Sequence, residues 1–397
     1  MRLLHTSDWH LGRLFHGASL LGEQAAALER IAELAAEAEV DAVLIAGDLY
    51  DRAIPPSEAV QLFNDTLSRL RGGGAAVVAI AGNHDSHVRV STYDGLLRSL
   101  GVTIRGDVRR AAEPVLVEPR RGGGPVAIYP LPYLEPSVDG PLLADPGPEE
   151  PLPRLRHQEV TALALERIHR DRRRRDQHSG GRHRSLLVAH TFVAGGEGCD
   201  SERELTVGNV DRVSVATFAG FDYVALGHLH GSQELDGPRL AYSGTPLPYS
   251  FSEEQQRKSV RIVELDAAGR ARAEVVPLEV GRPLRTLEGG IEALLTDPRH
   301  EAAERAWVRV FLTDEHLPLQ AMARLRQRFP HVAELRHRPP AVEPGSRGER
   351  DRRVREAASP LELATAFVTD QQGRAADPEE EALLRAALQA AERGRTR

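Results

Sequence analysis

The sequence predicts an α/β protein in which helices cover a largely parallel sheet. Short apolar strands alternate with amphipathic helices along residues 1–135, and this repetition produces parallel sheets. Clusters of Asp, Asn and His follow directly after several of the apolar strands. Because open α/β sheets bind their ligands at the carboxyl ends of strands, these clusters are candidates for one shared site.

The first elements follow from the spacing of apolar residues. Strands are predicted at residues 3–7, 40–46 and 75–81, with one helix at 24–39 and another from 57 onward. The second helix follows two prolines and carries an apolar stripe of Val60, Phe63, Leu67 and Leu70.

Residues 136–184 interrupt this order. They contain a Pro/Gly/Asp-rich stretch, a predicted helix near 158–169 and four arginines at 172–175. Further strands are predicted at 185–189, 222–226, 239–242 and 259–265. We interpret the triple glycines at 72–74 and 122–124 as turns, because neither lies in the context of a phosphate-binding loop.

Four parts are predicted along the chain. Residues 1–280 form the α/β domain, and 281–340 form a small α+β domain with strands at 307–312 and 332–336 around a helix at 317–329. Residues 341–358 are rich in Pro, Gly and Arg and are expected to be a linker. Two helices are predicted in 359–397. One begins at a serine N-cap followed by proline, and the other has three glutamates in its first turn.

The composition is that of a globular chain of 397 residues, 41% hydrophobic and 27% charged, without an apolar run long enough to span a membrane. No signal peptide is expected, because the first strand begins almost at Met1. Cys199 is the only cysteine, which excludes an internal disulfide framework and favours the cytoplasm. At a formal net charge of −7, nucleic-acid binding would require a local basic patch.

Lys258 is the only lysine of the chain. A phosphate-binding P-loop needs a lysine after a glycine-rich turn, and Lys258 follows Gln-Gln-Arg instead. The chain is therefore not expected to bind ATP by that route. If ATP is used, a partner must supply the ATPase.

Five clusters carry the candidate site: Asp8 and His10, Asp48, Asn83 with His84 and Asp85, His190, and His228 with His230. Their mix of carboxylate, amide and imidazole donors suits manganese, iron or zinc. Each cluster alone is a common loop pattern. Five of them, each after a predicted strand, indicate a two-metal hydrolase.

The predicted metal ligands have distinct expected places. Asp8 and His10 lie two residues apart on a segment expected to be extended, so both would project to one face. Asp48 is the candidate bridging ligand, and Asn83 contributes a neutral oxygen. Between two metals about 3.5–4 Å apart, an activated water would attack phosphorus in line with the leaving oxygen.

Four further residues are predicted to act on the substrate or on a catalytic group. His84 is the candidate to stabilise the transition state or to protonate the leaving oxygen. Asp85 is expected to hold the His84 imidazole in the required tautomer. Arg13 and Arg89 lie next to these motifs and are candidates for phosphate contacts.

Other polar residues are interpreted without a place among the metal ligands. Asp51 fits a surface carboxylate as well as a functional one. His5 has odd spacing from His10 and is expected to point away, while His87 and His183 are expected to be solvated. The run at 172–175 is equally compatible with DNA contact and with a solvated, mobile insertion.

These motifs resemble the calcineurin-like metallophosphoesterase superfamily and, within it, the SbcD nuclease subunits of bacterial SbcCD complexes. The resemblance covers nearly the whole chain. It is carried by His-Leu-Gly-Arg at 10–13, Gly-Asp-Leu-Tyr-Asp-Arg at 47–52, Pro-Pro at 55–56, Gly-Asn-His-Asp-Ser at 82–86, Gly-His-Leu-His at 227–230, Tyr-Ser-Gly at 242–244 and Leu-Thr-Asp-Glu at 312–315.

The resemblance implies a four-layer αββα nuclease core, a capping domain and a C-terminal segment that docks on the coiled-coil base of an SbcC-type ATPase. It also implies a homodimer, two manganese ions, and exonuclease and endonuclease cleavage of duplex DNA ends and hairpins under ATP control. DNA repair, recombination and replication are the implied processes.

By the same resemblance, one metal would be held by Asp8, His10, Asp48 and His230. The other would be held by Asp48, Asn83, His190 and His228, with His84 catalytic. The chain departs from some relatives at Asp51, where they carry a second active-site histidine, and at Thr245, where serine is more usual.

Two other functions compete with this interpretation. The first is a phosphoesterase of the same fold acting on small molecules such as nucleotides or cyclic diesters. The predicted cap and helical tail disfavour it, since such an enzyme needs neither. The second is a DNA-end scaffold with a decayed catalytic site, which the full set of expected ligands disfavours.

Overall fold

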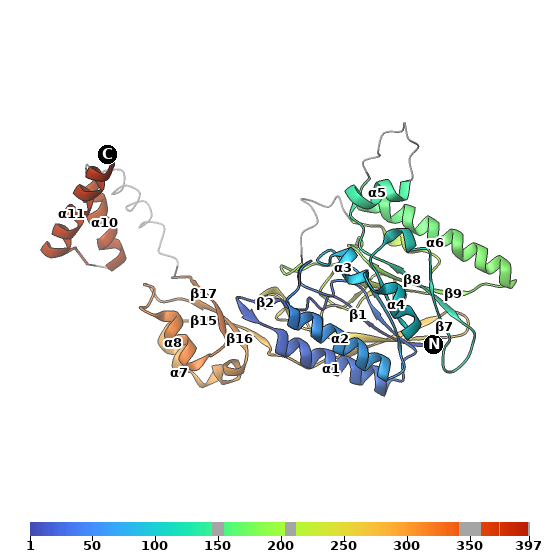
Figure 1. The fold of residues 1–397 in the computed structure, drawn as a ribbon. Coiled ribbons are helices and arrows are strands. Elements are labelled where there is room, and N and C mark those ends of the chain that lie inside the picture. The colour runs from blue at the N-terminus through green and yellow to red at the C-terminus, as the bar shows by residue number, and fades with distance from the viewer. Residues whose placement is uncertain (145–154, 203–211, 341–358, 373, 396–397) are drawn as a thin grey trace. The chain divides into compact units, whose positions relative to one another are not determined.

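A computed structural model describes residues 1–144, 155–202, 212–340, 359–372 and 374–395 (Figure 1). The chain divides into two compact units, 1–285 and 286–397, where the sequence suggests a first boundary at 280. The predicted linker at 341–358 lies outside the described residues. No helix among the described residues is long and apolar enough to cross a membrane.

The first unit contains two six-stranded sheets. In the first sheet four neighbouring strands run parallel: β1, β4, β5 and β6. β13 pairs with β1 in the antiparallel direction, and β14 pairs with β13 in the same way. Its spatial order is β14 (Ala271–Pro277), β13 (Ser259–Leu265), β1 (Arg2–Thr6), β4 (Ala42–Ile45), β5 (Ala76–Ile80) and β6 (Val102–Arg105).

The second sheet also has a parallel centre, formed by β8, β9, β10 and β12, with an antiparallel strand at each edge. Its spatial order is β11 (Gln233–Glu234), β12 (Leu240–Tyr242), β10 (Tyr223–Gly227), β9 (Arg184–His190), β8 (Val126–Leu131) and β7 (Val115–Val117).

Strand residues alternate between two cores, as the period of two in a β-strand requires. In β1, Leu3 packs between the two sheets, whereas Leu4 packs against the helices of the outer face. In β9, Leu186 and Val188 face the inter-sheet core, whereas Leu187 belongs to the cluster on the opposite face. The two sheets therefore pack face to face.

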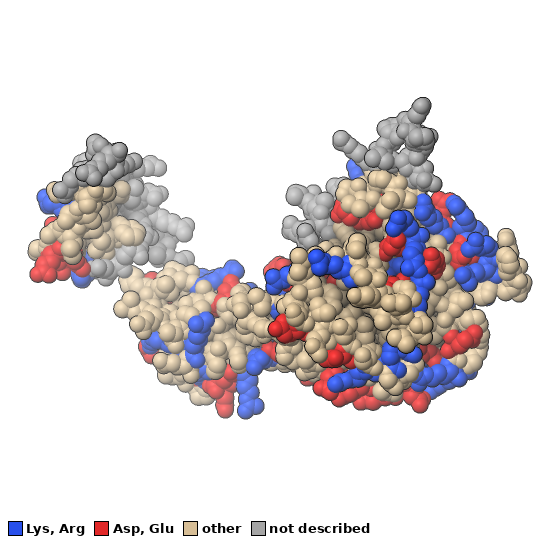
Figure 2. All heavy atoms as spheres, in the orientation of Figure 1, with Lys and Arg blue, Asp and Glu red and all other residues tan. Residues whose placement is uncertain are grey.

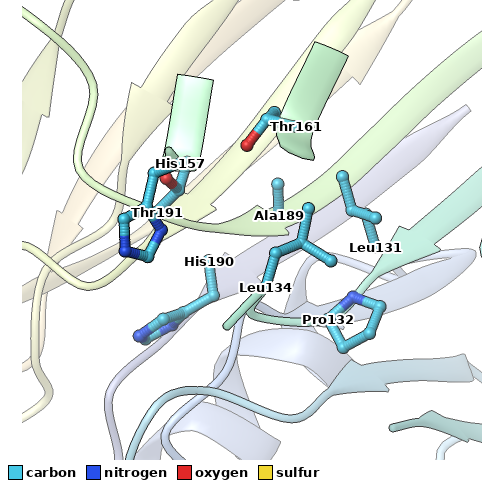
Figure 3. A pocket seen from close by; sticks show the side chains of 8 residues that line it. All are labelled: Leu131, Pro132, Leu134, His157, Thr161, Ala189, His190 and Thr191. Atoms are coloured by element: carbon cyan, nitrogen blue, oxygen red, sulfur yellow. The ribbon is translucent and has the colours of Figure 1, made fainter. Parts of the chain in front are cut away.

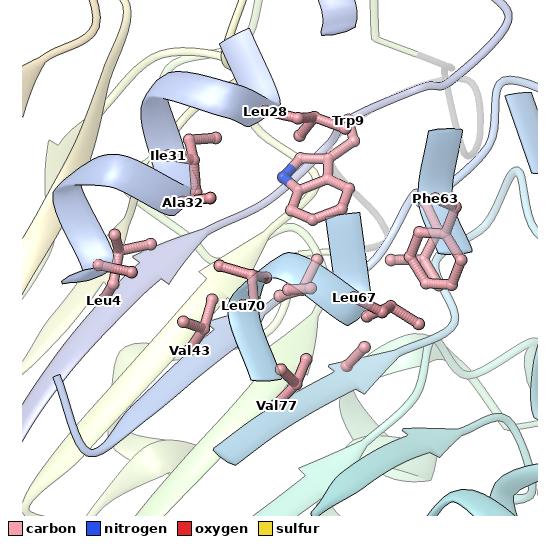
Figure 4. Packing of buried hydrophobic residues seen from close by; sticks show 14 of the residues in the cluster. Leu4, Trp9, Leu28, Ile31, Ala32, Val43, Phe63, Leu67, Leu70 and Val77 are labelled. Carbon is pink, nitrogen blue, oxygen red and sulfur yellow. The ribbon is translucent and has the colours of Figure 1, made fainter. Parts of the chain in front are cut away.

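Helices cover both outer faces, which completes the predicted four-layer αββα arrangement (Figure 1). On the first sheet lie α1 (Leu21–Glu37) and α2 (Ser57–Gly72), whose apolar residues, Phe63 among them, pack around Trp9 (Figure 4). On the second sheet lies α6 (His157–Ser179), next to α5 (Pro136–Ala144). The α/β fold class is confirmed.

Most predicted elements lie within a few residues of the observed ones, and β13 has the predicted bounds. The stripe on α2 differs in one place. Val60 is 36% exposed, and Ala59 occupies the buried position instead. The triple glycines are turns as predicted, because α2 ends at Gly72 and all three glycines at 122–124 have positive φ.

The arginine run at 172–175 belongs to α6, which continues ten residues beyond its predicted end. Arg172 lies over the ring of Phe221, with 4.6 Å between its guanidinium carbon and the ring centroid. Arg174 and Arg175 both pair with buried Asp171, at 2.5 and 2.6 Å. Pairs spaced three and four residues apart stabilise a helix, so the run extends α6.

The second unit contains a three-stranded sheet with two helices and its own core. Its strands are β15 (Leu284–Gly289), β16 (Trp307–Leu312) and β17 (Val332–His337), and its helices are α7 (Ile291–Thr296) and α8 (Ala321–Arg328). The helix predicted from 317 begins later, because Gln320 has a left-handed backbone. These elements form a small α+β fold.

Two helices follow near the C-terminus, α10 (Pro360–Gln372) and α11 (Pro378–Arg395), and they contact each other. The predicted serine N-cap is present, since the hydroxyl of Ser359 accepts a hydrogen bond from the Glu362 amide at 3.2 Å. Phe367 and Leu383 are well exposed on these helices.

Candidate active site

The seven predicted metal ligands meet at one end of the two sheets. Asp8, Asp48 and Asn83 follow β1, β4 and β5 of the first sheet. From the second sheet, His190 ends β9, and His228 with His230 follow β10. All except Asn83 are buried. Face-to-face packing of the sheets thus brings together residues separated by more than 200 positions.

One group of donors gathers around His10 and His230. Their Nε2 atoms lie 3.2 Å apart, and Nε2 of His10 lies 3.5 Å from Oδ2 of Asp48. Asp8 completes this group, since donor atoms of Asp8, His10 and His230 all lie within 4.8 Å of one another.

A second group gathers on the other side of Asp48. Nε2 of His190 lies 2.9 Å from Oδ1 of Asn83 and 3.5 Å from Oδ2 of Asp48. Nδ1 of His228 lies 3.4 Å from the same Asn83 oxygen. Oδ2 of Asp48 is therefore equally close to His10 in one group and to His190 in the other.

The backbone at these ligands is strained. Asp8, His10, Asp48 and His228 have φ values of 54°, 45°, 49° and 107°, a region that costs a non-glycine residue free energy. The expectation of an extended segment for Asp8 and His10 was wrong, since β1 ends at Thr6. The two side chains converge because the chain turns with left-handed dihedrals.

Two glycines allow the ligands to approach one another. A Cβ atom on Gly82 would lie 2.1 Å from Oδ1 of Asp48, and one on Gly47 would lie 2.3 Å from Nδ1 of His190. Either side chain would displace a ligand, so glycine is required at both positions.

Burial sets the protonation of the site in favour of a cation. It lowers the pKa of His10 and His228 well below the usual value and that of His190 to about 4, so these imidazoles are neutral. Burial also raises the pKa of Asp8 and Asp48, and the nearby carboxylate of Asp48 raises the pKa of Asp8 further. Neutral imidazoles and carboxylates that converge in this way fit divalent metal ions.

Hydrogen bonds hold several ligands in the orientation that metal binding needs. Nδ1 of His190 donates to the carbonyl oxygen of Ala46 at 2.8 Å, which leaves a lone pair on Nε2. The carboxylate of Asp8 accepts from the His228 amide at 3.0 and 3.2 Å. Oδ1 of Asp48 accepts from the His84 amide at 2.9 Å, so its other oxygen faces the two groups.

His84 lies beside the first group, with its ring centroid 4.7 Å from that of His10. Its Nδ1 lies 2.9 Å from the carbonyl oxygen of Asp51, which can only accept a hydrogen bond. Nδ1 therefore carries a proton, and Nε2 remains available to exchange one. The side chain is only half-buried, as a residue that meets substrate requires.

The predicted role of Asp85 was wrong. Its carboxylate accepts backbone hydrogen bonds from Leu49, Tyr50 and Gly82 at 2.9 to 3.0 Å, and it makes none to His84. Asp85 instead joins the loops after β4 and β5, which carry Asp48 and Asn83. The carbonyl of Asp51 supplies the tautomer-fixing acceptor that we assigned to Asp85.

The two arginines predicted to contact phosphate have different environments. Arg13 pairs with Asp51 at 3.3 Å and lies over the Tyr249 ring, next to the first group. Arg89 is exposed on the short helix α3 (His87–Ser91). Oδ1 of Asp51 also lies 3.8 Å from Nδ1 of His10, so Asp51 supports the site from outside the ligand groups.

His5 is a core residue, as its spacing suggests. It is fully buried, accepts a hydrogen bond at Nδ1 from the Tyr223 hydroxyl at 2.8 Å, and contacts the Leu226 carbonyl through Nε2 at 3.1 Å. His87 and His183 are half-buried rather than fully solvated.

A small pocket borders His190 and is lined by apolar residues and by the start of α6 (Figure 3). His157 faces the same space from the first turn of α6. Leu131 and Leu134 form part of the pocket wall.

Sequence reasoning missed a group of residues behind His230. The imidazole contacts Ser201, which contacts Glu253, and Lys258 pairs with that glutamate. Burial alone would raise the pKa of Glu253, but its hydrogen bonding with His230 and the ammonium of Lys258 lower it to about 2. The one signal in the sequence that could have pointed to this group was the uniqueness of Lys258.

Comparison with known proteins agrees with this site. The calcineurin-like phosphoesterase family model matches residues 1–232, and the model described as the Type 5 capsule protein repressor C-terminal domain matches 280–372. The SbcD subunit of the nuclease SbcCD from Bacillus subtilis (strain 168) is 34% identical over 349 residues, which cover 85% of each chain. The SbcD subunit from Staphylococcus saprophyticus is 31% identical over 336 residues, 84% of each chain.

The segments matched by the family models, 1–232 and 280–372, lie in both units, and the first contains every predicted ligand. A family model that spans more than half of the chain, together with relatives above 30% identity over most of both lengths, establishes membership. The enzyme is a phosphodiester hydrolase with a site for divalent metal ions. The chain belongs to the calcineurin-like phosphoesterase family and is an SbcD-type nuclease within it.

Proposed function

We propose that this chain is the dimetal nuclease component of an SbcCD-type complex and that it cleaves duplex DNA ends and hairpins. The observation that carries the proposal is the position of Asp48 Oδ2, 3.5 Å from Nε2 of both His10 and His190. A carboxylate oxygen between two donor groups fits a bridging ligand of a two-metal site.

In this proposal Asp8, His10, Asp48 and His230 hold one ion, and Asp48, Asn83, His190 and His228 hold the other. Two divalent ions, which we propose to be manganese, would activate a water for attack on phosphorus and neutralise charge on the phosphate oxygens. The surrounding residues exclude water from the donors and keep the imidazoles neutral, and backbone hydrogen bonds hold several of the ligands in place.

His84 acts on the leaving group. With Nδ1–H bound to the Asp51 carbonyl, its Nε2 can carry a proton to the departing 3′ or 5′ oxygen. A half-exposed ring next to the first donor group fits this role better than any other ionisable group of the site. We propose Arg13 and Arg89 as phosphate contacts, of which Arg13 lies nearer to the ligands.

Contact with DNA would use small groups of basic side chains, because acidic and basic side chains are interspersed on the face in view (Figure 2). Every phosphate contact by an arginine releases counterions and makes binding salt-dependent. The paired arginines of α6 are weaker candidates, since Arg174 and Arg175 already bind Asp171.

Homodimer formation is supported by an exposed apolar patch directly after the site. Over α3, α4 (Asp94–Leu97) and the following turn, the exposed large hydrophobic residues are Val88, Tyr93, Leu96 and Leu100. Contiguous exposed apolar side chains are typical of an interaction surface. A second copy placed here would cover these side chains.

The C-terminal helices are proposed to bind the SbcC-type ATPase. Leu363, Phe367 and Leu383 are exposed there, and no side chain of α10 or α11 is fully buried among those described. A helix pair without a core of its own needs a further surface to cover its apolar residues. ATP-dependent access to DNA would then be controlled by that partner.

The experiment that tests the proposal is cleavage of an end-labelled duplex and a hairpin with Mn²⁺, with and without the ATPase partner and ATP. A small chromogenic phosphodiester is measured in parallel. Cleavage of DNA that depends on partner and ATP is expected. Activity on the small diester alone would retain the dimetal site but move the chain to the small-molecule branch.

A further inference from the structure

We propose that Ser201, Glu253 and Lys258 are positioning residues that hold the His230 imidazole with its Nε2 lone pair directed at the first metal. The inference rests on the proposed dimetal function and adds residues that touch neither metal nor substrate. It rests on a chain of buried hydrogen bonds. The carboxylate at one end of this chain determines which atom donates in each bond.

The chain starts at His230 and ends at a carboxylate. Nδ1 of His230 lies 2.6 Å from Oγ of Ser201, and Oγ lies 2.5 Å from Oε1 of Glu253. A carboxylate can only accept, so the serine hydroxyl donates to Glu253. Oγ then accepts from Nδ1–H of His230, which leaves Nε2 unprotonated and able to bind a metal.

This direction depends on Glu253 being ionised, and its surroundings ensure that. Glu253 is fully buried, yet Oε2 pairs with the ammonium of Lys258 and Oε1 also accepts from the Tyr249 amide at 3.1 Å. A buried carboxylate with a cation and further donors remains charged.

Lys258 holds more than the carboxylate. Its ammonium also donates to the carbonyl oxygen of His230 at 3.0 Å and to Oε1 of Gln256 at 2.8 Å. Three acceptors around one nitrogen suit a compact ammonium rather than a planar guanidinium. This explains why the chain, which otherwise uses only arginine, has its single lysine here.

His230 is therefore held at three points. Ser201 binds its side chain, Lys258 binds its carbonyl, and Oε1 of Glu202 accepts from its amide at 2.7 Å. His190 differs, because its Nδ1 donates to a backbone carbonyl that no substitution can remove. The affinity for the first metal should therefore depend on side chains behind the site, whereas the affinity for the second metal should not.

The test is titration of the full chain with Mn²⁺ in a calorimeter, for the wild type and for Ser201→Ala and Lys258→Met. Loss of such supporting groups typically weakens metal affinity about 10- to 100-fold. We expect this decrease in Mn²⁺ affinity at one of the two metal sites and an unchanged affinity at the other. Ser259→Ala is the matched control, because it removes a buried hydroxyl that has no hydrogen-bond partner among the described residues.

A second measurement needs no metal. In the metal-free wild type, ¹⁵N-histidine spectra should show His230 protonated at Nδ1. Ser201→Ala should shift it towards the Nε2–H form, while Ser259→Ala should not. Protonation of His230 at Nε2 in the wild type would overturn the proposal even if a variant failed to fold.

The outcomes separate this inference from the proposed function. If the wild type binds no Mn²⁺, the dimetal function fails. If the wild type binds two ions and Ser201→Ala binds them with the same two affinities, the dimetal function stands and the positioning role is wrong. Weakening of both sites in Ser201→Ala would also contradict it, because the chain of hydrogen bonds ends at His230 alone.

Discussion

The Nε2 atoms of His10 and His230 lie 3.2 Å apart, although the two residues are separated by 220 positions in the chain. Two neutral imidazoles at this distance either share one proton or present both lone pairs to one cation. Nδ1 of His10 has no hydrogen-bond partner among the described residues, and Oδ1 of Asp51 lies 3.8 Å from it. Metal binding would therefore move a proton from Nε2 to Nδ1 of His10, towards that carboxylate.

Replacing His84 with alanine should abolish DNA cleavage while leaving metal binding intact. The imidazole is not needed by either donor group, and loss of a general acid typically costs about 10²- to 10⁴-fold in rate. Cleavage of a labelled duplex and Mn²⁺ titration are measured together, with His183→Ala as control. Full activity in His84→Ala would remove His84 from the mechanism.

Chelation should lower the thermal stability of the chain. Asp8 and Asp48 are buried with raised pKa, so a bound cation relieves an electrostatic cost of the folded state. At a metal concentration one hundred times Kd, binding adds about 2.7 kcal/mol to the free energy of unfolding. Tm should rise with Mn²⁺ and fall with chelator in the wild type but not in Asp48→Ala. An unchanged wild-type Tm would contradict a metal site in the folded chain.

His5 should make the protein sensitive to acid. Burial and the charge of Arg261 lower the pKa of His5 from 6.5 to about 3, so the imidazole is neutral when folded. The folded-state pKa lies below the unfolded value, so this contribution to stability is present above pH 6.5 and is lost as pH falls towards 3.

The size of this loss of stability follows from the lowered pKa of His5. By pH 4.5 the loss should reach about 2 to 3 kcal/mol, at 1.36 kcal/mol per pH unit. Urea unfolding of the wild type and His5→Gln between pH 7 and 4.5 measures it, because the difference between the two isolates His5 from the other histidines. Parallel pH profiles would show that His5 titrates normally.

Leu96→Asp should convert a homodimer into a monomer. Leu96 is 73% exposed in the patch after the active site, where a charge would be buried on dimer formation. Sedimentation measures the oligomeric state, and Leu116→Asp introduces the same charge at an exposed leucine of β7. A dimer that survives Leu96→Asp, or that Leu116→Asp also disrupts, would place the interface elsewhere.

Phe367→Glu should weaken association with the SbcC-type ATPase, and deletion of residues after 358 should abolish it. Phe367 is the exposed aromatic residue of α10, whereas neither change touches the metal ligands. Co-purification measures association, and Mn²⁺ titration should remain unchanged. Leu319→Glu, at a more exposed leucine of the second unit, is the control. A truncated chain that still co-purifies would refute this assignment.

The sequence by itself determined the α/β class, the strands that precede the ligand clusters and the seven ligand candidates, because these depend on local patterns. Alternation of apolar residues identifies a strand within a few positions, and a polar cluster at its end is visible without the partner strands. The length of α6 escaped prediction, since its last turns depend on pairs with Asp171 rather than on apolar periodicity.

Only the tertiary structure decided how the ligands are oriented. It showed that Asp8 and His10 converge through left-handed backbone, that Asp85 binds backbone amides, and that His230 is held through Ser201 and Glu253. Such contacts join residues 29 to 52 positions apart in the loops around His230. Hydrogen bonds of this range leave no periodic trace in the sequence, because their geometry exists only after the two sheets have packed.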